Sequence, residues 1–206
     1  MVDLLSTLLD NLNYWYIILL MAIESSFIPF PSEVVVPPAA YKAAGGEMNV
    51  VLVVVAATIG ALIGSLVNYA LAYFIGRPII YRFANSRLGH MLLLSKEKIE
   101  TAEQYFDRHG AASTFFGRLI PAVRQLISIP AGLARMNMGK FLLYTTLGAG
   151  IWNTILAAIG YYLHSVVSED ELAAKVSEYS HELNMIILAA VAIVLAYIIY
   201  KGVKKK

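Results

Sequence analysis

The hydrophobic residues of this 206-residue chain fall into long blocks separated by short polar segments. The clearest block runs over residues 50–74 without a charged side chain, and a second block of similar character covers residues 141–163. A third, slightly shorter block covers residues 185–200. A helix needs about 20 apolar residues to cross the hydrocarbon core of a bilayer. The pattern therefore predicts three transmembrane helices.

Two further apolar stretches, residues 14–44 and 111–133, are interrupted by prolines and charges. A proline in a helix interior costs about 3 kcal/mol, and a charge in the bilayer costs about 2.5–3.5 kcal/mol. Irregular backbone is tolerated inside a membrane where protein encloses it or where it lines a cavity. We therefore predict two re-entrant helical hairpins; the alternative for the first is that its first leg spans the membrane fully. The residues expected to shape the hairpins are Pro29, Pro31, Gly117, Pro121 and Pro130.

The polar segment 76–110 carries alternating basic and acidic residues, with Ile99, Ala102 and Phe106 at helical spacing until Gly110. This pattern predicts an amphipathic linker helix that ends at Gly110. The linker divides one membrane domain into a first half, residues 1–75, and a second half, residues 111–206. The first half begins with a lead-in helix at the membrane interface, and the second half ends in a basic tail.

Small residues recur at every fourth position of the first long block, at Gly60 and Gly64, and Asn68 continues the row. Small residues at this spacing let two helix backbones approach closely. The row predicts a close-packing face, and packing is the favoured role for Asn68.

The distribution of basic residues predicts the orientation. The basic linker and the tail at residues 201–206 should be cytoplasmic, and the acidic loop at residues 165–182 should lie outside. The two hairpins then open to opposite sides. The spacing of Pro29 to Pro38 repeats as Pro121 to Pro130, and the two halves resemble the inverted repeats of secondary transporters.

Composition supports an all-α integral membrane protein, because 59% of the residues are hydrophobic and only 15% are charged. The first 13 residues have two aspartates and no Lys or Arg, unlike a cleaved signal peptide. There is no cysteine, and the four histidines lack metal-ligand spacing, so we expect no metal and no cofactor. The net charge of +2 gives no indication of nucleic-acid binding.

The most informative residues are four charges within the interrupted stretches: Glu24 and Glu33 in the first, and Arg118 and Arg124 in the second. One interpretation is neutralisation, with buried ion pairs that hold the hairpins together. The other is function, because ionisable groups inside membranes commonly mark substrate or ion paths. A guanidinium binds phosphate through two parallel hydrogen bonds. A carboxylate can exchange a proton as its surroundings change.

These residues predict a site in which Arg118 and Arg124 bind an anionic headgroup while Glu24 and Glu33 couple its release to protons. The two polar residues that we expect to complete the pocket are Gln125 and Asn153.

Two motifs resemble the signatures of the DedA (VTT-domain) membrane proteins: E-x4-P-x-P-x-E over Glu24 to Glu33, and F-G-R-L-I-P-x-x-R over Phe116 to Arg124. A Y-x-x-G-R step at Tyr73 is similar too, and the resemblance covers about residues 15–164. It implies a bacterial inner-membrane protein with two opposed re-entrant hairpins that returns lipid carriers, notably undecaprenyl phosphate, across the membrane. It also implies a link to the proton motive force, and the four charges match the family's functional acids and arginines.

The compact P-F-P-S-E ending at Glu33 looks like the subgroup linked to undecaprenyl phosphate, whereas other members have a longer stretch ending in Pro-Gly and an acid. Other subgroups are linked to phosphatidylethanolamine, and eukaryotic relatives to lipid scrambling.

The sequence thus predicts a multi-pass protein of the bacterial cytoplasmic membrane, with its C-terminus inside, that translocates a polyprenyl phosphate. Monomer and homo-oligomer both stay open. A phospholipid flippase or scramblase and a proton- or cation-coupled small-ion exchanger are alternatives, although a cation path gains nothing from two fixed arginines. We predict no enzymatic activity, because an enzyme needs a nucleophile with a base or a metal, and neither motif has a histidine.

Overall fold

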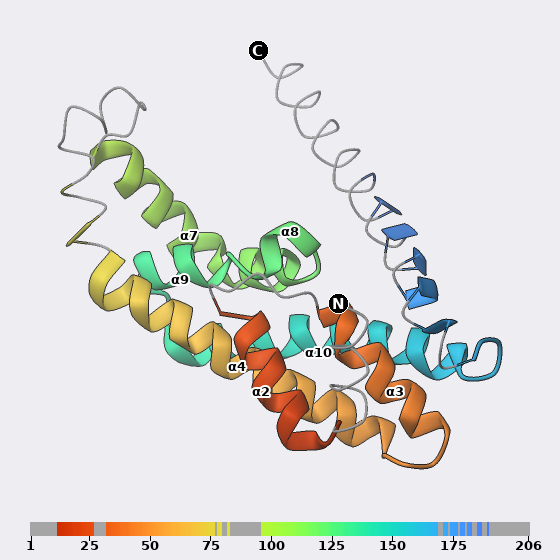
Figure 1. Cartoon of the computed structure of the whole chain (residues 1–206). Helices are drawn as coiled ribbons and strands as arrows, with labels where there is room; N and C mark the ends of the chain where they lie inside the picture. Colours follow the sequence, from red (N-terminus) through yellow and green to blue (C-terminus); the bar gives the residue numbers. More distant parts are fainter. Residues whose placement is uncertain are drawn as a thin grey trace.

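The computed structural model describes residues 12–26, 32–76, 78–79, 82 and 96–168, and then residues 171–172, 174–176, 178–179, 181–182, 185–186 and 189. All elements in these ranges are helical, as predicted (Figure 1). In chain order they are α2 (Tyr14–Glu24), η1 (Ser32–Val34), α3 (Val36–Ala44), α4 (Val50–Leu71), η2 (Ala72–Gly76), α7 (Lys96–Arg118), α8 (Pro121–Arg124), α9 (Ser128–Leu133) and α10 (Met138–Leu163).

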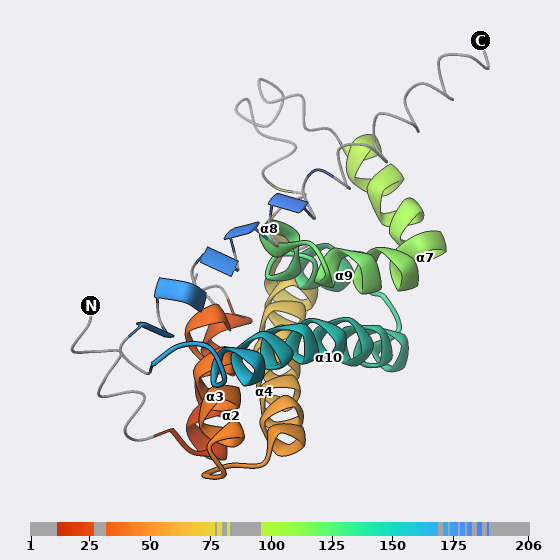
Figure 2. The same cartoon turned by 90° about the vertical axis from the view of Figure 1, so that its right-hand side faces the viewer.

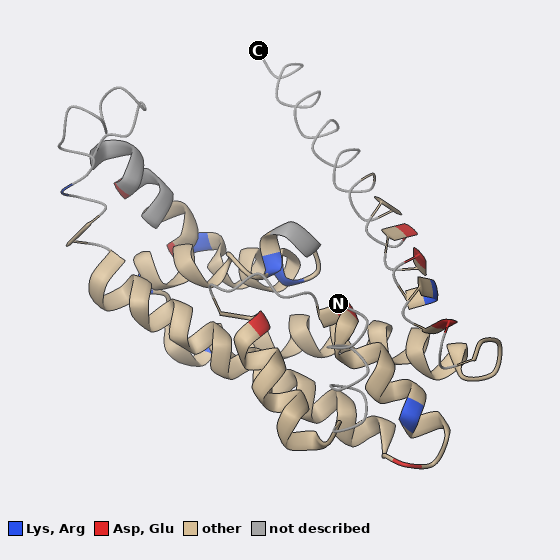
Figure 3. Ribbon diagram, in the orientation of Figure 1, with Lys and Arg blue, Asp and Glu red and all other residues tan. Residues whose placement is uncertain are grey.

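Among the described residues, two helices are long and apolar enough to cross a membrane. The first is α4 with its π-helical continuation η2, 27 residues in all, and the second is α10, with 26 residues. Figure 3 shows both almost free of charged residues. Each begins where an asparagine caps it: Asn49 accepts from the amides of Val51 and Leu52, and Asn137 accepts from that of Lys140. Of the third predicted helix only residues 185, 186 and 189 are described, and residues 1–11, which include most of the lead-in helix, lie outside the described residues. So do residues 77, 80–81 and 83–95 of the linker.

The first interrupted stretch folds as helix, break and helix. α2 ends at Glu24, and the chain resumes with η1 and α3. Pro37 and Pro38 occupy the first turn of α3, where the missing amide protons have no helical partner to lose. Pro29 and Pro31 lie outside the described residues.

The second interrupted stretch repeats this plan with shorter pieces. α7 ends at Arg118, α8 begins with Pro121 at its first position, and α9 has Pro130 in its first turn. The prolines therefore mark helix starts in both stretches. Gly117 lies against Ile127, and a Cβ there would come within 2.8 Å of the Ile127 side chain.

The prediction that the linker helix ends at Gly110 is wrong, because α7 continues through it to Arg118. A Cβ at Gly110 would lie 2.8 Å from the Phe106 ring and 3.3 Å from the Met136 sulfur. Glycine in a helix interior costs about 1 kcal/mol relative to alanine, and here close packing offsets this cost. The linker helix and the first leg of the second stretch are thus one helix, whose N-terminal end extends beyond the rest of the bundle (Figures 1 and 2).

The interrupted stretches pack reciprocally on the two long helices, which cross steeply (Figure 2). α2 lies on α4 and α7 on α10, whereas α3 lies on α10 and α9 on α4. Glycines permit the contacts: a Cβ at Gly60 or Gly64 would collide with the α2 backbone, as the predicted close-packing face requires. At the α3 crossing, a Cβ at Gly160 would collide with the carbonyl oxygen of Pro37.

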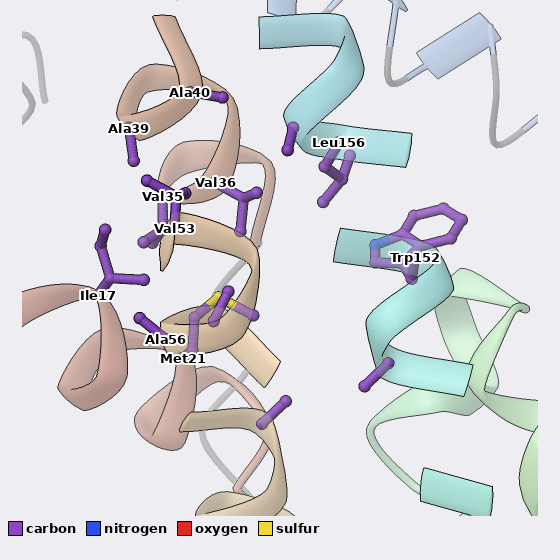
Figure 4. Packing of buried hydrophobic residues seen from close by; sticks show 14 of the residues in the cluster. Ile17, Met21, Val35, Val36, Ala39, Ala40, Val53, Ala56, Trp152 and Leu156 are labelled. Carbon is purple, nitrogen blue, oxygen red and sulfur yellow. The ribbon is translucent and has the colours of Figure 1, made fainter. Parts of the chain in front are cut away.

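The main hydrophobic core lies between α2, α3, α4 and α10 (Figure 4). Small residues of α3 and α4 face the larger side chains of α2 and α10, so the helices approach closely. Its labelled members are Ile17, Met21, Val35, Val36, Ala39, Ala40, Val53, Ala56, Trp152 and Leu156. A second cluster, which includes Tyr69, Phe106, Ile127 and Phe141, fills the space between α4, α7, α9 and α10. Glu24, Arg118 and Arg124 are thereby buried inside the bundle.

Gly160→Ala should lower stability by about 1–3 kcal/mol, because the added methyl meets backbone that cannot move aside. Thermal unfolding in detergent, followed by circular dichroism, measures the change. Gly150→Ala on the same helix is the matched control, since its new Cβ would have nothing nearer than Thr58 Oγ1 at 4.0 Å. Equal stabilities for the two variants would contradict the close contact at Gly160.

Candidate functional site

The four predicted charges come from four different helices and lie close together. Glu24 ends α2, Glu33 lies in η1, Arg118 ends α7 and Arg124 ends α8. Arg124 Nη2 lies 2.7 Å from Glu24 Oε1 and 3.6 Å from Glu33 Oε2. The side chains of Glu24 and Arg124 are only 3% and 9% exposed. A single guanidinium therefore bridges both carboxylates and joins the two interrupted stretches.

Arg118 is also buried, but hydroxyl groups hold it instead of a carboxylate. Its Nη2 donates to Ser128 Oγ at 2.9 Å and to Ser65 Oγ. Ser65 in turn donates to the carbonyl oxygen of Ala61. Among the described residues Arg118 has no carboxylate within ion-pair distance. The two arginines, equivalent by residue type, thus have different partners.

Asn68 links the long helix α4 to both interrupted stretches. Its Nδ2 donates to the carbonyl oxygen of Ser25 at 3.2 Å and to that of Gln125 at 3.4 Å. The packing role favoured from the sequence is confirmed. Because Ser25 and Gln125 immediately follow Glu24 and Arg124, Asn68 holds together the two breaks that carry the ion pair.

A small cavity is lined by the charged groups together with residues of α4 and α10. Its open space of about 10 Å³ is roughly that of one water molecule. A phosphate group is larger, so the described conformation is closed and binding would require movement. The lining residues come from α2, α4, α7, α8 and α10 and from the segments that follow α2 and α8: Met21, Glu24, Ser25, Ala61, Arg118, Arg124, Gln125, Ala149, Trp152 and Asn153.

Three N–H donors of the lining residues are buried without an acceptor in the described part of the chain: Arg118 Nε, Arg124 Nε and Trp152 Nε1. Buried polar groups are normally hydrogen-bonded, so such groups call for an explanation. Trp152 also lies against Arg124, with the guanidinium carbon 5.1 Å from the ring centroid. A ligand rich in acceptor oxygens would satisfy these donors.

The sequence predicts six residues in the pocket. Five of them line the cavity: Glu24, Arg118, Arg124, Gln125 and Asn153. The sixth, Glu33, lies outside the lining and contacts Arg124. The roles assigned to the individual residues stay predictions.

Sequence reasoning missed the neutral partners Ser65, Ser128 and Trp152. Ser65 lies three positions before Asn68, on the same side of the helix, and Trp152 directly precedes Asn153. Their positions beside these two asparagines could have indicated that they belong to the site. Another missed contact is Thr58, whose Oγ1 accepts from Asn153 Nδ2 at 3.3 Å.

The VTT domain matches residues 30–162, which include three of the four charges. The chain belongs to the VTT-domain family. The predicted membership of the DedA (VTT-domain) family is thereby confirmed, and the chain is a membrane protein. No solved structure matches it.

Three relatives illustrate the range of names in the family. Undecaprenyl phosphate transporter A of Bacillus subtilis is 32% identical over 195 residues, which cover 95% of this chain and 92% of that protein. The Staphylococcus aureus protein of the same name is 28% identical over 206 residues, covering 100% and 99%. An alkaline phosphatase-like protein of Lactococcus lactis is 33% identical over 206 residues, covering 100% and 94%. Within the described residues, no three His, Asp or Glu side chains lie together as metal ligands would.

Proposed function

We propose that this VTT-domain protein is a lipid-phosphate translocase that returns undecaprenyl phosphate across the bacterial cytoplasmic membrane, driven by the proton motive force. The observation that carries the proposal is the pair of buried arginines whose unpartnered N–H groups surround one cavity. The two relatives named undecaprenyl phosphate transporter A support the same class of substrate.

Arg118 and Arg124 bind the phosphate group. A guanidinium keeps its charge when buried and matches two phosphate oxygens at once. The Trp152 indole N–H supplies a further donor, and the side-chain amides of Gln125 and Asn153 complete the polar lining. The apolar part of the lining, Met21, Ala61 and Ala149, suits the first carbons of a prenyl chain.

Glu24 and Glu33 couple the phosphate to protons, because they compete with it for Arg124. With both carboxylates ionised, Arg124 is held at 2.7 Å and 3.6 Å from their oxygens. Protonation of the carboxylates weakens this attraction and frees the guanidinium for phosphate. When the carboxylates lose their protons on the other side, they reclaim Arg124 and expel the anion.

Movement of the two interrupted stretches gives access to the cavity. In this proposal residues 14–44 and 111–133 are re-entrant hairpins that open to opposite sides of the membrane. The spans are residues 50–74, 141–163 and 185–200, within one domain, and the basic tail is cytoplasmic. The closed cavity then corresponds to an occluded state between two open ones.

Transport in reconstituted vesicles tests the proposal. Labelled polyprenyl phosphate should cross protein-containing liposomes faster than protein-free ones, and a pH gradient should shift it towards one leaflet. Collapsing the gradient with a protonophore should abolish this shift. Movement no faster than in protein-free vesicles would overturn the proposal, and so would release of inorganic phosphate from the lipid. Labelled phosphatidylethanolamine, run in parallel, separates a polyprenyl phosphate carrier from a phospholipid flippase.

A further inference from the structure

The two arginines of the site differ in what neutralises them. Arg124 faces two carboxylates, whereas Arg118 faces two serine hydroxyls. Both are buried, at 7% and 3% exposure, so solvent screens neither charge well. This difference separates their roles.

The serines hold Arg118 in place without cancelling its charge. Ser65 lies on α4 and Ser128 on α9, so the guanidinium is fixed between two elements that pack together. The Ser65 hydroxyl proton is directed to the carbonyl oxygen of Ala61, which leaves a lone pair of Oγ for Arg118. Glu24 lines the same cavity and acts on Arg118 electrostatically, but it forms no direct ion pair with it. A buried charge without a paired counter-charge is costly. The unpartnered Nε adds to this cost in the closed state.

Arg124, in contrast, lies beside two carboxylates in the closed conformation. The charged groups around it are Glu24 from α2, Glu33 from η1 and Arg118 from α7. The long helices add only uncharged neighbours, Asn68 on α4 and Trp152 on α10. An anion can therefore reach Arg124 only in competition with the carboxylates.

We propose that Arg118 is a permanent anion ligand, positioned by Ser65 and Ser128, and that Arg124 is a second ligand available only after Glu24 and Glu33 take up protons. This inference rests on the proposed function of the site. The substrate class that fits is a phosphate monoester, because it becomes a dianion above its second pKa of about 6 and so matches two guanidinium groups. At alkaline pH one arginine binds it, and at lower pH both do.

Isothermal titration of the full-length protein in detergent with farnesyl phosphate tests this division. Titrations between about pH 8.5 and about pH 6.5 keep the phosphate largely dianionic. Wild type should bind about tenfold or more tightly at the lower pH, the effect of gaining a charge-assisted contact. Arg124→Gln should lose this gain. Arg118→Gln should lose alkaline binding.

The same titrations also test the positioning role of the two serines. Ser65→Ala and Ser128→Ala should each weaken alkaline binding by about three- to tenfold but leave the gain at lower pH unchanged. Ser128→Thr, which keeps the hydroxyl, should restore the affinity. Thr114→Val is the matched control, because within the described residues this buried hydroxyl on α7 donates to the Met136 sulfur, outside the cavity lining. The affinity of this variant should equal that of wild type at every pH.

The results separate failure of the inference from failure of the proposed function. If both arginine variants lose affinity equally at every pH, the division of roles is overturned, although transport by wild type in vesicles would still support the proposed function. If serine variants with wild-type thermal stability bind farnesyl phosphate as wild type does, the positioning role is overturned. Equal binding of farnesol and farnesyl phosphate would overturn both proposals.

Discussion

A chain with alanine at both positions 118 and 124 should move polyprenyl phosphate at least about 100-fold more slowly than wild type. In the proposed function each guanidinium contributes charge-assisted hydrogen bonds to the phosphate, worth about 1.5–3 kcal/mol. The two arginines are the only cations lining the described cavity. Initial rates in proteoliposomes under a fixed pH gradient measure the loss. A rate close to wild type would remove the arginines from the transport step.

The double alanine variant also leaves Glu24 buried without its partner, which can destabilise a protein by about 3–5 kcal/mol. Lysine at both positions separates this effect from phosphate binding, because lysine keeps the charge but cannot form the planar bidentate contact. The lysine variant should fold with nearly wild-type thermal stability and still transport at least about tenfold more slowly. Full activity would show that the arginines only neutralise the carboxylates.

The long helices could be predicted from the sequence because their signal is local. Residues 50–74 and 141–163 contain no charge, and the observed helices extend these ranges by only a few residues, to Gly76 and back to Met138. The breaks were also predictable, since proline restricts its own turn wherever it occurs. Gly110 was misjudged because its role depends on Phe106 and Met136, and Met136 is contributed by a distant turn.

The site was predictable by residue type but not by pairing. Two acids and two arginines in apolar surroundings suggested mutual neutralisation or a binding pocket, and the structure brings them together. It also shows an asymmetry that composition does not contain: Arg124 holds both acids, whereas Arg118 relies on Ser65 and Ser128. Ser65 precedes Arg118 by 53 positions. Only the packing of α4 against its neighbours determines that they meet.

In the proposed function this asymmetry makes the carboxylates around Arg124 the groups that exchange protons. Glu24 also accepts a hydrogen bond from Ser25 Oγ at 2.7 Å on its second oxygen, so its orientation is fixed while it holds the arginine. Glu33 is farther from Arg124 and more exposed, at 15%. Protons can thus reach Glu33 more easily, and Glu24 forms the tighter contact. Both must change for Arg124 to be released completely.

Glutamine at both positions 24 and 33 should therefore uncouple transport from protons. The variant imitates the protonated carboxylates permanently, so Arg124 stays available and polyprenyl phosphate should equilibrate between the leaflets without being driven by a pH gradient. The measurement is the ratio of label in the two leaflets, which should become independent of the gradient. Glu47→Gln is the matched control, because Glu47 is exposed, lies away from the site and forms an ion pair with Lys42 at 3.7 Å. This variant should keep the wild-type response to the gradient. Gradient-driven accumulation by the double glutamine variant would mean that another group carries the protons, since neither amide can titrate.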